Sequence, residues 1–530
     1  MRFSRFNRIA FIFFLSAACG LLACSSLTTP PRLTKTRVPE NQASEPSFYA
    51  APTPTGNALE LPDQSIDENE QLLNPILTVW INETSNAHQK MLEEMTIELD
   101  RDYGLHMEFV LVDESRMADL VKDAAEVNKL PDVIIHSLAY STGWAERGVF
   151  DTRLTNDVLE SLGRDSFDPV AIDLIDVDGN PAALPVTGYK QVLIYRQDWF
   201  DTLSLAPPTD YRSILQGARA IYRSDTLSAQ TGISSTLLSG LVVPTESDLV
   251  TTHQVFEHFA IANNCDLVAD TGQVTVLTPE CFDTFEFYRE LVNGFSPSDI
   301  QTDISAINAY LSGRTGMILG SPDLLLQIAG LSTERQPACP ECLEDPTFLI
   351  TNSGVNTQIA GRSSFRDPAE FGQMSLIGFT TGTQPELAER FANYWYNDGY
   401  MRWIGVEPIM RVPMRPGTLD DPTKFLVAWD TLPVDGEGST VSDILGAETT
   451  QRLVEGVAVS PRWGIQSRQG DLIATVYEDN ILSIVLQEML SGYFTSSQAI
   501  VAASERVVEQ IPGYAFETDV PVFIPSNDSE

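Results

Sequence analysis

Residues 76–135 alternate between apolar runs and amphipathic helical patterns, and this alternation constrains the fold more than any other feature of the chain. Three runs are predicted strands: 76–81, 105–111 and 131–135. After the first run, Met91, Met95 and Leu99 recur every four residues, as one face of a helix requires, and Gly104 ends the pattern. Strands and helices in this order indicate βαβ units and a mainly parallel sheet, whose ligands bind at the carboxyl ends of the strands.

The rest of the chain passes several times between strand-rich and helix-rich segments. Further strands are predicted at 182–189, 192–195, 317–319 and 374–379. Further helices are predicted at 117–124, 282–292, 304–311 and 385–395, and over most of the C-terminal third. From about residue 73 onward the chain is long enough for two packed lobes with full cores. The repeated passage indicates lobes that are discontinuous in sequence.

The N-terminus has the pattern of a secretory signal. Three arginines precede an almost wholly apolar run over 9–18, which is too short for a permanent membrane-spanning helix. The run closes on Leu-Leu-Ala-Cys at 21–24, which resembles the bacterial lipobox for lipid attachment and cleavage. We therefore expect a lipoprotein signal peptide over 1–23 and lipidation of Cys24, which anchors the chain to a membrane. The alternative is an ordinary signal peptide that is cut elsewhere.

The segments next to both termini lack a sustained apolar period. Residues 24–72 are rich in Ser, Thr, Pro, Asn and Glu, so they cannot bury enough surface to offset their ordering entropy. We expect a disordered tether there, and a polar tail over 516–530.

The charge balance excludes some partners. The chain has 33 basic and 73 acidic residues and a net charge of -40. Nucleic acid is therefore not an expected partner, because its phosphates need Lys and Arg. Electrostatic adhesion to anionic lipid is disfavoured for the same reason. The acids are spread along the chain, as on a surface that favours solubility.

Four cysteines lie beyond the signal peptide and the lipobox, and in an exported protein they are expected to form disulfides. Four cysteines allow three pairings. Proximity in sequence favours Cys265 with Cys281 and Cys339 with Cys342. The second pair forms a C-x-x-C string, which could instead be a redox motif or half of a zinc site.

Motifs that carry catalysis are missing from the sequence. It contains no G-x-S-x-G nucleophile elbow, no P-loop and no G-x-G-x-x-G string. The five histidines do not have zinc-ligand spacing. With so many acids, a pair of carboxylates suited to glycoside hydrolysis carries little information. We therefore predict no catalytic residue, no cofactor and no metal.

Aromatic residues next to predicted strand ends and loops are candidates for carbohydrate contact, because a sugar face stacks on an aromatic ring. The candidates are Trp80, Trp144, Tyr189, Trp403, Trp429 and Trp463. Core packing explains most tryptophans in proteins, so each of these rings has that alternative.

Three segments carry a resemblance to a known family. The first is 184–200, LPVTGYKQVLIYRQDWF, with the turn Pro-Pro-Thr at 207–209. The others are YLSGRTGMILGS at 310–321, and AERFANYW at 388–395, which continues to Gly405. Their order and spacing resemble the family 1 extracellular solute-binding proteins, the maltose-binding-protein-like lipoproteins of ABC importers, over about 75–510.

The resemblance implies an α/β fold with the two-lobe architecture of type II periplasmic binding proteins, a hinge and an interlobe cleft. It implies an N-lobe of 73–187 and 376–412, and a helix-rich C-lobe of 188–375 and 413–515. It implies these cleft-lining residues: Asn82, Glu83, Ser137, Gly188, Tyr189, Ser321, Asp323, Trp403, Arg411 and Trp463. The family often has an aromatic residue where Asp323 stands.

The function implied is capture of a small solute, foremost a sugar or oligosaccharide, for a separate permease and ATPase. We expect a monomer that is lipid-anchored outside the cytoplasm and closes on its ligand by a population shift. Two alternatives remain at this point: a surface lipoprotein that hydrolyses glycosides, and a sensor that presents a bound solute to another receptor.

Overall fold

The structure is a computed structural model that describes residues 75–332, 335–362 and 367–515. The expected signal peptide over 1–23, the lipidation site Cys24, the tether over 24–72 and the tail over 516–530 lie outside the described residues.

The first sheet begins with three parallel strands, as the sequence predicts. They are β1 (Ile76–Ile81), β2 (His106–Leu111) and β3 (Val133–Ser137), and β1 pairs in parallel with both neighbours. The connections are α2 (Asn86–Glu98) and α3 (Glu114–Glu126). The predicted βαβ units are therefore confirmed.

Local sequence explains where these two helices begin and end. The side chain of Ser85 accepts a hydrogen bond from the backbone of His88 at the start of α2, and that of Asp113 caps α3 in the same way. After α2 the helix continues as one π-helical turn and ends at Gly104, whose φ of 56° suits a residue without a side chain. The residues that recur every four along α2 are buried against the sheet, so the periodicity is that of a core-facing stripe.

The other half of the first sheet is antiparallel. It contains β6 (Leu184–Lys190), β10 (Gly372–Phe379) and β11 (Val412–Pro413), and the full strand order is β11-β6-β10-β3-β1-β2. Strand β10 runs antiparallel to both β3 and β6. The sheet is thus mixed rather than mainly parallel, because β10 enters it on return from the second sheet and not through a crossover helix.

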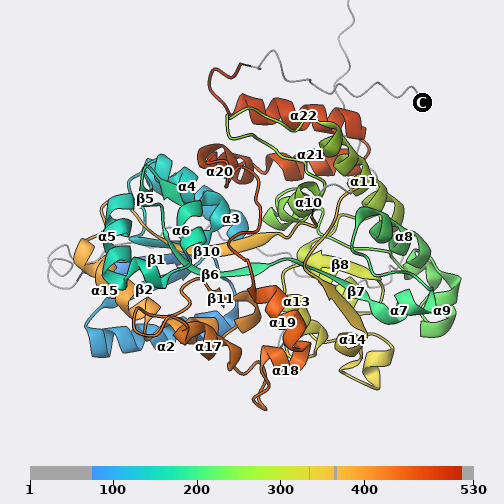
Figure 1. Cartoon of the computed structure of the whole chain (residues 1–530), viewed down its shortest axis with the longest axis horizontal. Coiled ribbons are helices and arrows are strands. Elements are labelled where there is room, and N and C mark those ends of the chain that lie inside the picture. Colours follow the sequence, from blue (N-terminus) through green and yellow to red (C-terminus); the bar gives the residue numbers. More distant parts are fainter. Residues whose placement is uncertain (1–74, 333–334, 363–366, 516–530) are drawn as a thin grey trace, which may run out of the picture. The chain divides into compact units, whose positions relative to one another are not determined.

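The second sheet has three antiparallel strands, in the order β8-β7-β9. They are β7 (Val192–Arg196), β8 (Met317–Gly320) and β9 (Ser353–Asn356). In Figure 1 the first sheet lies to the left and the second to the right. A separate two-stranded hairpin joins β4 (Asp176–Val177) and β5 (Asn180–Pro181).

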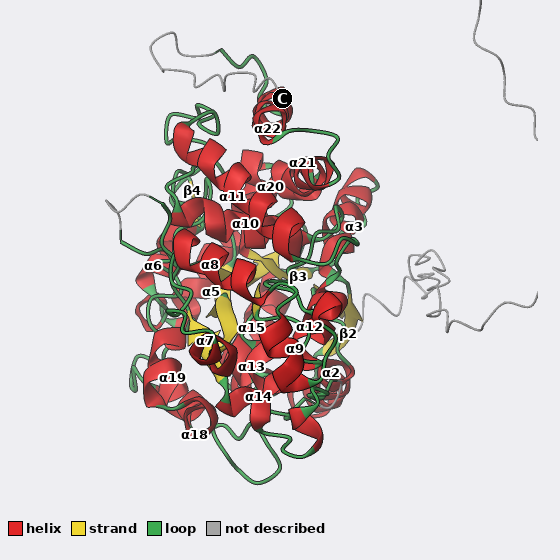
Figure 2. Ribbon diagram, turned by 90° about the vertical axis from the view of Figure 1, so that its right-hand side faces the viewer, coloured by secondary structure: helices red, strands yellow, loops and turns green. Residues whose placement is uncertain are grey.

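Helices cover both sheets, and Figure 2 shows the strands enclosed by them. Those nearest the first sheet in sequence are α4 (Leu138–Glu146), α5 (Thr152–Leu162), α6 (Pro169–Leu174), α15 (Pro385–Tyr396), α16 (Tyr400–Ile404) and α17 (Lys424–Asp430). Those of the second are α7 (Gln197–Thr202), α8 (Tyr211–Ile221), α9 (Asp225–Thr231), α10 (Val250–Ala262), α11 (Pro279–Phe295), α12 (Asp303–Leu311), α13 (Asp323–Ile328) and α14 (Phe348–Thr351).

The C-terminal helices are α18 (Val441–Leu445), α19 (Ala447–Val454), α20 (Gly470–Glu478), α21 (Ile481–Leu490) and α22 (Ser496–Glu509). We call the first sheet with its helices the first lobe, and the second sheet with its helices the second lobe. Helix α20 packs closely on α4 of the first lobe. A Cβ on Gly143 of α4 would lie 2.5 Å from the Cβ of Ala474 in α20, so only glycine fits this contact. On its other side α20 reaches α10, where the ring of Tyr477 stacks on His253 at 3.9 Å between centroids. The helix therefore contacts both lobes. Within the described residues, no helix has the length and apolar character that crossing a membrane requires.

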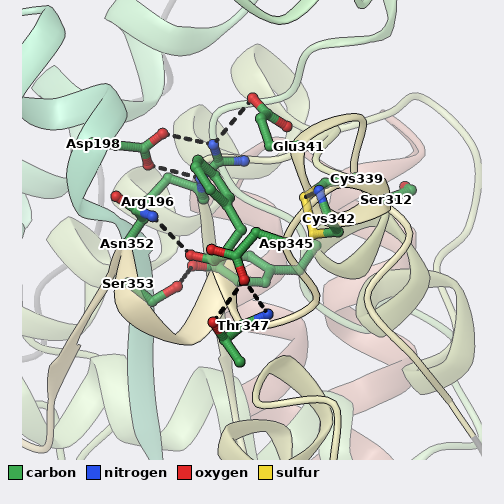
Figure 3. Close-up of a disulfide and its surroundings, with 12 residues drawn as sticks. Arg196, Asp198, Ser312, Cys339, Glu341, Cys342, Asp345, Thr347, Asn352 and Ser353 are labelled. Carbon is green, nitrogen blue, oxygen red and sulfur yellow. Dashed lines mark hydrogen bonds and ion pairs between the residues drawn. A yellow bond between two sulfur atoms is a disulfide. The ribbon is translucent and has the colours of Figure 1, made fainter.

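Both disulfides join the cysteines that proximity in sequence favours, Cys265 with Cys281 and Cys339 with Cys342. This pairing is confirmed, and the C-x-x-C string is a disulfide here rather than half of a zinc site. The second bridge lies beside the buried Arg196, which donates to Asp198 at 2.8 and 2.7 Å (Figure 3). Glu341, inside the disulfide loop, is 3.8 Å from the same guanidinium.

Candidate functional site

The two sheets are joined at a crossing where β6 passes into β7 and where the chain returns to β10. The backbone N–H of Gln191 donates to the carbonyl of Phe371 at 3.0 Å, so these two connections run side by side. The segment 455–463, between α19 and α20, packs on them. A Cβ on Gly372 would lie 2.4 Å from the carbonyl oxygen of Val457, so glycine permits this approach. The chain thus changes sheets at Gln191 and Phe371, a few residues from the ends of the expected lobe ranges.

A buried ion pair holds this crossing together. Arg462 donates from Nε to Glu257 at 2.8 Å, and both side chains are 1% exposed. The same guanidinium donates to the carbonyl of Gly372 and to Gln373 of β10, each at 3.1 Å. Tyr477 of α20 accepts from Arg462 and donates to Glu257. Burial acts to raise the pKa of Glu257, but the charges of Arg462 and His253, together with the hydrogen bonds from Arg462 and Tyr477, hold that pKa below its ordinary value.

A pocket of about 70 Å³ lies beside the crossing, at the carboxyl end of β8. Its polar lining residues are Tyr189, Gln191, Thr251, Gln254, Asp303 and Ser321. Asp303 is the first residue of α12, and the hydroxyl of Thr251 donates to it at 3.0 Å. Gln254 is 2% exposed, and its Nε2 has no hydrogen-bond partner in the described part of the chain. The pocket therefore combines a carboxylate with an unused amide donor.

Glu114, the first residue of α3, is not part of this lining, but its charge interacts with that of Asp303. Burial raises the pKa of the Glu114 carboxyl, and the charges of Asp113 and Asp303 add to the rise. The side chain of Ser137 and the charge of Arg462 oppose it. Burial, followed by the charges of Glu114 and Asp323, likewise raises the pKa of Tyr189. Side chains from both lobes thus act on one another across the pocket.

Two expected cleft residues follow β8. The hydroxyl of Ser321 donates to Asp323, and the amide of Gln327 donates to the other carboxylate oxygen at 2.7 Å. Burial raises the pKa of Asp323. The charge of Asp323 in turn helps to raise the pKa of Asp303, after burial of Asp303 itself. Asp303 therefore interacts electrostatically with both of the other carboxyl groups, Glu114 and Asp323.

A second cluster of expected residues lies after β1. Arg411 donates to Glu83 at 2.8 Å, and its guanidinium lies over the ring of Trp403, 4.1 Å from the centroid. The nearest ring nitrogen of His88 is 2.7 Å from Arg411. Burial and then the Arg411 charge lower the pKa of His88 to about 2, so the imidazole is neutral. The structure thus joins Glu83, Trp403 and Arg411 in one charged cluster.

Glu83, His88 and Glu407 each offer a ligand atom within 4.8 Å of the others, as a metal site would. However, Arg411 Nη2 lies 2.8 Å from the Glu83 carboxylate and 3.6 Å from that of Glu407. The positive charge between the carboxylates is therefore already supplied by the protein. The arrangement fits an ion-pair cluster better than a metal centre.

The remaining expected residues lie at the same edge of the first sheet. Asn82 follows β1, and its backbone N–H donates to the carbonyl of Ile135 in β3 at 3.1 Å. Ser137 is the last residue of β3. Gly188 lies within β6, where a Cβ would approach Val457 to 2.7 Å, so this glycine serves close packing at the crossing.

Most of the candidate aromatic residues are in the core. The tryptophans have at most 7% of their surface exposed: Trp80, Trp144, Trp403, Trp429 and Trp463. The indole of Trp463 donates to the carbonyl of Cys265 at 2.6 Å. Tyr189, in contrast, is half-buried and lines the pocket. Ligand contact with Tyr189, Trp403 or Trp463 stays a prediction.

Sequence reasoning missed four polar residues at the pocket and the crossing: Glu114, Gln254, Asp303 and Arg462. A signal existed for Glu114, because it opens the helix after β2, as Asn82 and Glu83 follow β1. Gln254 and Asp303 lie on helices that do not directly follow strands of the second sheet. Only the folded arrangement brings them together.

Comparison with known proteins adds evidence on the fold. No family model matches the chain. The putative ABC transporter periplasmic-binding protein YcjN of Escherichia coli K12 is 20% identical over 364 residues, which cover 67% of this chain and 77% of YcjN.

Solved structures match over a larger part of the chain. An ABC transporter solute-binding protein of Thermotoga lettingae TMO, bound with α-D-tagatose, aligns with a TM-score of 0.62 and 17% identity. The alignment covers 82% of this chain and 99% of that protein. Maltose-bound MalE3 of T. maritima aligns with a TM-score of 0.61 and 15% identity, over 82% and 100% of the two chains. These comparisons confirm the predicted resemblance and the two-lobe type II binding-protein fold.

Proposed function

We propose that this chain, which has the fold of ABC-transporter solute-binding proteins, captures a sugar or oligosaccharide outside the cytoplasm and delivers it to a membrane permease. The ATPase that drives import would be a separate chain. The observation that carries the proposal is the pocket beside the crossing, where Asp303 and the unused amide of Gln254 can bind hydroxyl groups. A pocket needs only a few such polar groups to orient a ligand.

The proposed ligand contacts come from both lobes. Ser137 and Glu114 belong to the first lobe, while Ser321 and Asp303 belong to the second. Tyr189 lies at the crossing and would stack on the face of the sugar. A ligand that contacts both lobes would bind the closed arrangement more tightly than the open one. Closure would therefore be a population shift.

The other expected residues have different proposed roles. Asn82 and Glu83 follow the carboxyl end of β1, and Arg411, just before β11, donates to Glu83; these three residues would contact the distal part of a longer solute. Gly188, Trp403 and Trp463 pack tightly and would hold the walls in place. The proteins matched above carry names of binding proteins, which favours binding over catalysis.

We also propose the predicted anchoring. Cys24 would carry acyl chains that hold a monomer at the outer side of a membrane, and more than one chain gives stable anchoring. Incorporation of labelled palmitate into the wild-type chain, and its loss in the Cys24→Ala variant, would test this. Labelling of the variant to the same extent would place the acyl group elsewhere.

A thermal-shift screen of the mature protein tests the function. The panel contains mono- and oligosaccharides, with amino acids and polyamines as other classes. A specific ligand at about 100 times its Kd stabilises the protein by roughly 2.7 kcal/mol. We expect at least one carbohydrate to raise Tm and to be recovered chemically unchanged. Stabilisation by another class alone, or hydrolysis of the sugar, would contradict the proposal.

A further inference from the structure

We infer that the solute carries a protonated amine beside its hydroxyl groups, as an amino sugar does, and that the pocket next to Asp303 receives the amine. The inference rests on the proposed function and narrows its ligand class. A volume of about 70 Å³ is room for about two small polar groups, since a liquid water takes up about 30 Å³. The pocket is therefore a subsite for one end of the solute rather than for a whole ring.

The lining of the pocket has a negative charge that no lining cation balances. Asp303 is the carboxylate of this lining, and neither Lys nor Arg occurs among the lining residues that the structure describes. Glu114, the first residue of α3, is a second carboxylate outside this lining: its Oε1 is buried without a hydrogen-bond partner in the described residues, and its charge interacts with that of Asp303. An ammonium group between the two lobes would be attracted to both.

The nearby arginines are engaged elsewhere. The charge of Arg462 opposes the rise in the pKa of Glu114, but Arg462 is paired with Glu257. All three guanidinium nitrogens of Arg462 donate to other groups at the crossing. The charge of Arg335 helps to lower the pKa of Asp323, and the Asp323 carboxylate also accepts hydrogen bonds from Ser321 and Gln327. Glu114 and Asp303 are therefore the carboxyl groups with most to gain from a ligand cation.

An anionic solute is disfavoured by the same arrangement. Glu114 and Asp303 are the first residues of α3 and α12, so the chain's own carboxylates already occupy the positive ends of these helices. A ligand carboxylate or phosphate would meet like charges there. The positive helix ends lower the free energy of burying the two carboxylates, but they are not a counter-ion.

A separate observation points to a hydroxylated ligand. The side chain of Gln254 is 2% exposed and lines the pocket, and among residues 75–332, 335–362 and 367–515 its Nε2 finds no acceptor. A buried amide donor without a partner is costly, so a ligand oxygen there is favourable. Oε1 of Glu114 is likewise buried without a partner in the described residues. One acceptor for Gln254 and one charged donor for the carboxylates together describe an amino sugar.

Matched sugars test the inference on the wild-type mature protein. Isothermal titration compares glucosamine, galactosamine and mannosamine with their neutral parents and their N-acetyl forms. We expect at least one amine to bind tenfold or more tightly than both of its counterparts. If a neutral or N-acetyl sugar binds as well as its amine, the inference is wrong while the proposed function stands. If no sugar of any kind binds, or spermidine binds instead, the proposed function itself fails.

Two isosteric variants test the residues. Asp303→Asn and Glu114→Gln should each weaken the amine at least tenfold more than they weaken the neutral parent. Both should raise the Tm of the ligand-free protein, because each removes a buried charge that burial disfavours. A purely structural role would lower Tm instead. The control Asp299→Asn removes the same charge from an exposed position of the second lobe and should change neither quantity. Equal weakening of amine and neutral sugar would overturn the inference.

Discussion

Arg462 and Glu257 form an ion pair, with 2.8 Å between Nε and Oε1, where the connections between the two sheets run side by side. Each side chain is 1% exposed, so neither charge can turn to solvent. The guanidinium also holds the first residues of β10. The pair therefore joins α10, β10 and the segment before α20.

Arg462→Met should destabilise the protein by about 3–5 kcal/mol, because it leaves the Glu257 carboxylate buried without its partner. Urea denaturation of both proteins gives the difference in free energy of unfolding. Arg219→Met is the matched control, since Arg219 pairs with Glu290 on the surface and should cost less than about 1 kcal/mol. Equal losses in both variants would show that the crossing does not depend on the buried pair.

The stabilisation by Glu257 should depend on pH. Its pKa is lowered in the folded protein, so the carboxylate stabilises the fold above the unfolded pKa of about 4.3 and loses that effect as pH falls through the folded pKa. The difference in unfolding free energy between wild type and Glu257→Gln should be largest near neutral pH and shrink below about pH 4. Denaturation series at several pH values measure it. A difference that grows on acidification would mean that the folded pKa is raised.

Trp463→Ala should cost about 3–5 kcal/mol, because it leaves a cavity and removes the indole donor to Cys265. Trp463→Phe keeps most of the ring and should cost less. Chemical denaturation gives both values, and calorimetry with a bound sugar gives the affinity of the variants that fold. Unchanged stability with weakened sugar binding would instead identify the ring as a ligand contact.

Gly143→Ala should destabilise the protein by about 1–3 kcal/mol, because the added methyl has no space between α4 and α20. Gly294→Ala in α11 is the control: its Cβ would meet nothing within 4 Å, and alanine favours a helix by about 1 kcal/mol over glycine. Thermal unfolding should therefore shift in opposite directions. A neutral Gly143→Ala would mean that the two helices are not held at this distance.

Replacement of Cys265 and Cys281 by alanine should cost about 3 kcal/mol, the value expected for a loop of this length. The loop between Cys339 and Cys342 is much shorter, so its removal should cost less through chain entropy. Denaturation of the two double variants compares them. A larger loss at Cys339 and Cys342 would show that the bridge acts mainly through the position of Glu341 beside Arg196.

The elements with strong periodicity could be predicted from the sequence. The predicted strand 76–81 is β1, and the helix with Met91 and Met95 is α2. Predictions for β7, β8, α11 and α12 are also close to the observed bounds. In these segments the spacing of apolar residues indicates directly which face is buried. Strand β9 was not predicted, because its sequence Ser-Gly-Val-Asn is short and polar, and it pairs only through its position beside β7.

The candidate site could be predicted only in part. The family resemblance implied Ser137, Tyr189 and Ser321: Tyr189 and Ser321 line one pocket, and Ser137 lies beside Glu114 near it. Asp303 and Gln254 could not be found, since the pocket depends on how α10 and α12 pack on the end of β8. Trp463 resembled a ligand contact in sequence, yet its ring is buried. A sequence pattern shows that a ring is apolar but not whether it faces a core or a cleft.

The contact between α4 and α20 has a consequence for how the pocket opens. Because α20 is tied to α10 through Tyr477 and lies against the backbone of α4, the lobes meet through a helix pair as well as through strands. If one lobe rotates against the other, we expect α4 to slide along α20, which is a shear movement. Packed helices shear by small steps, since their side chains keep their rotamers. A side chain at Gly143 would block this sliding, because there is no space for a Cβ between the two helices.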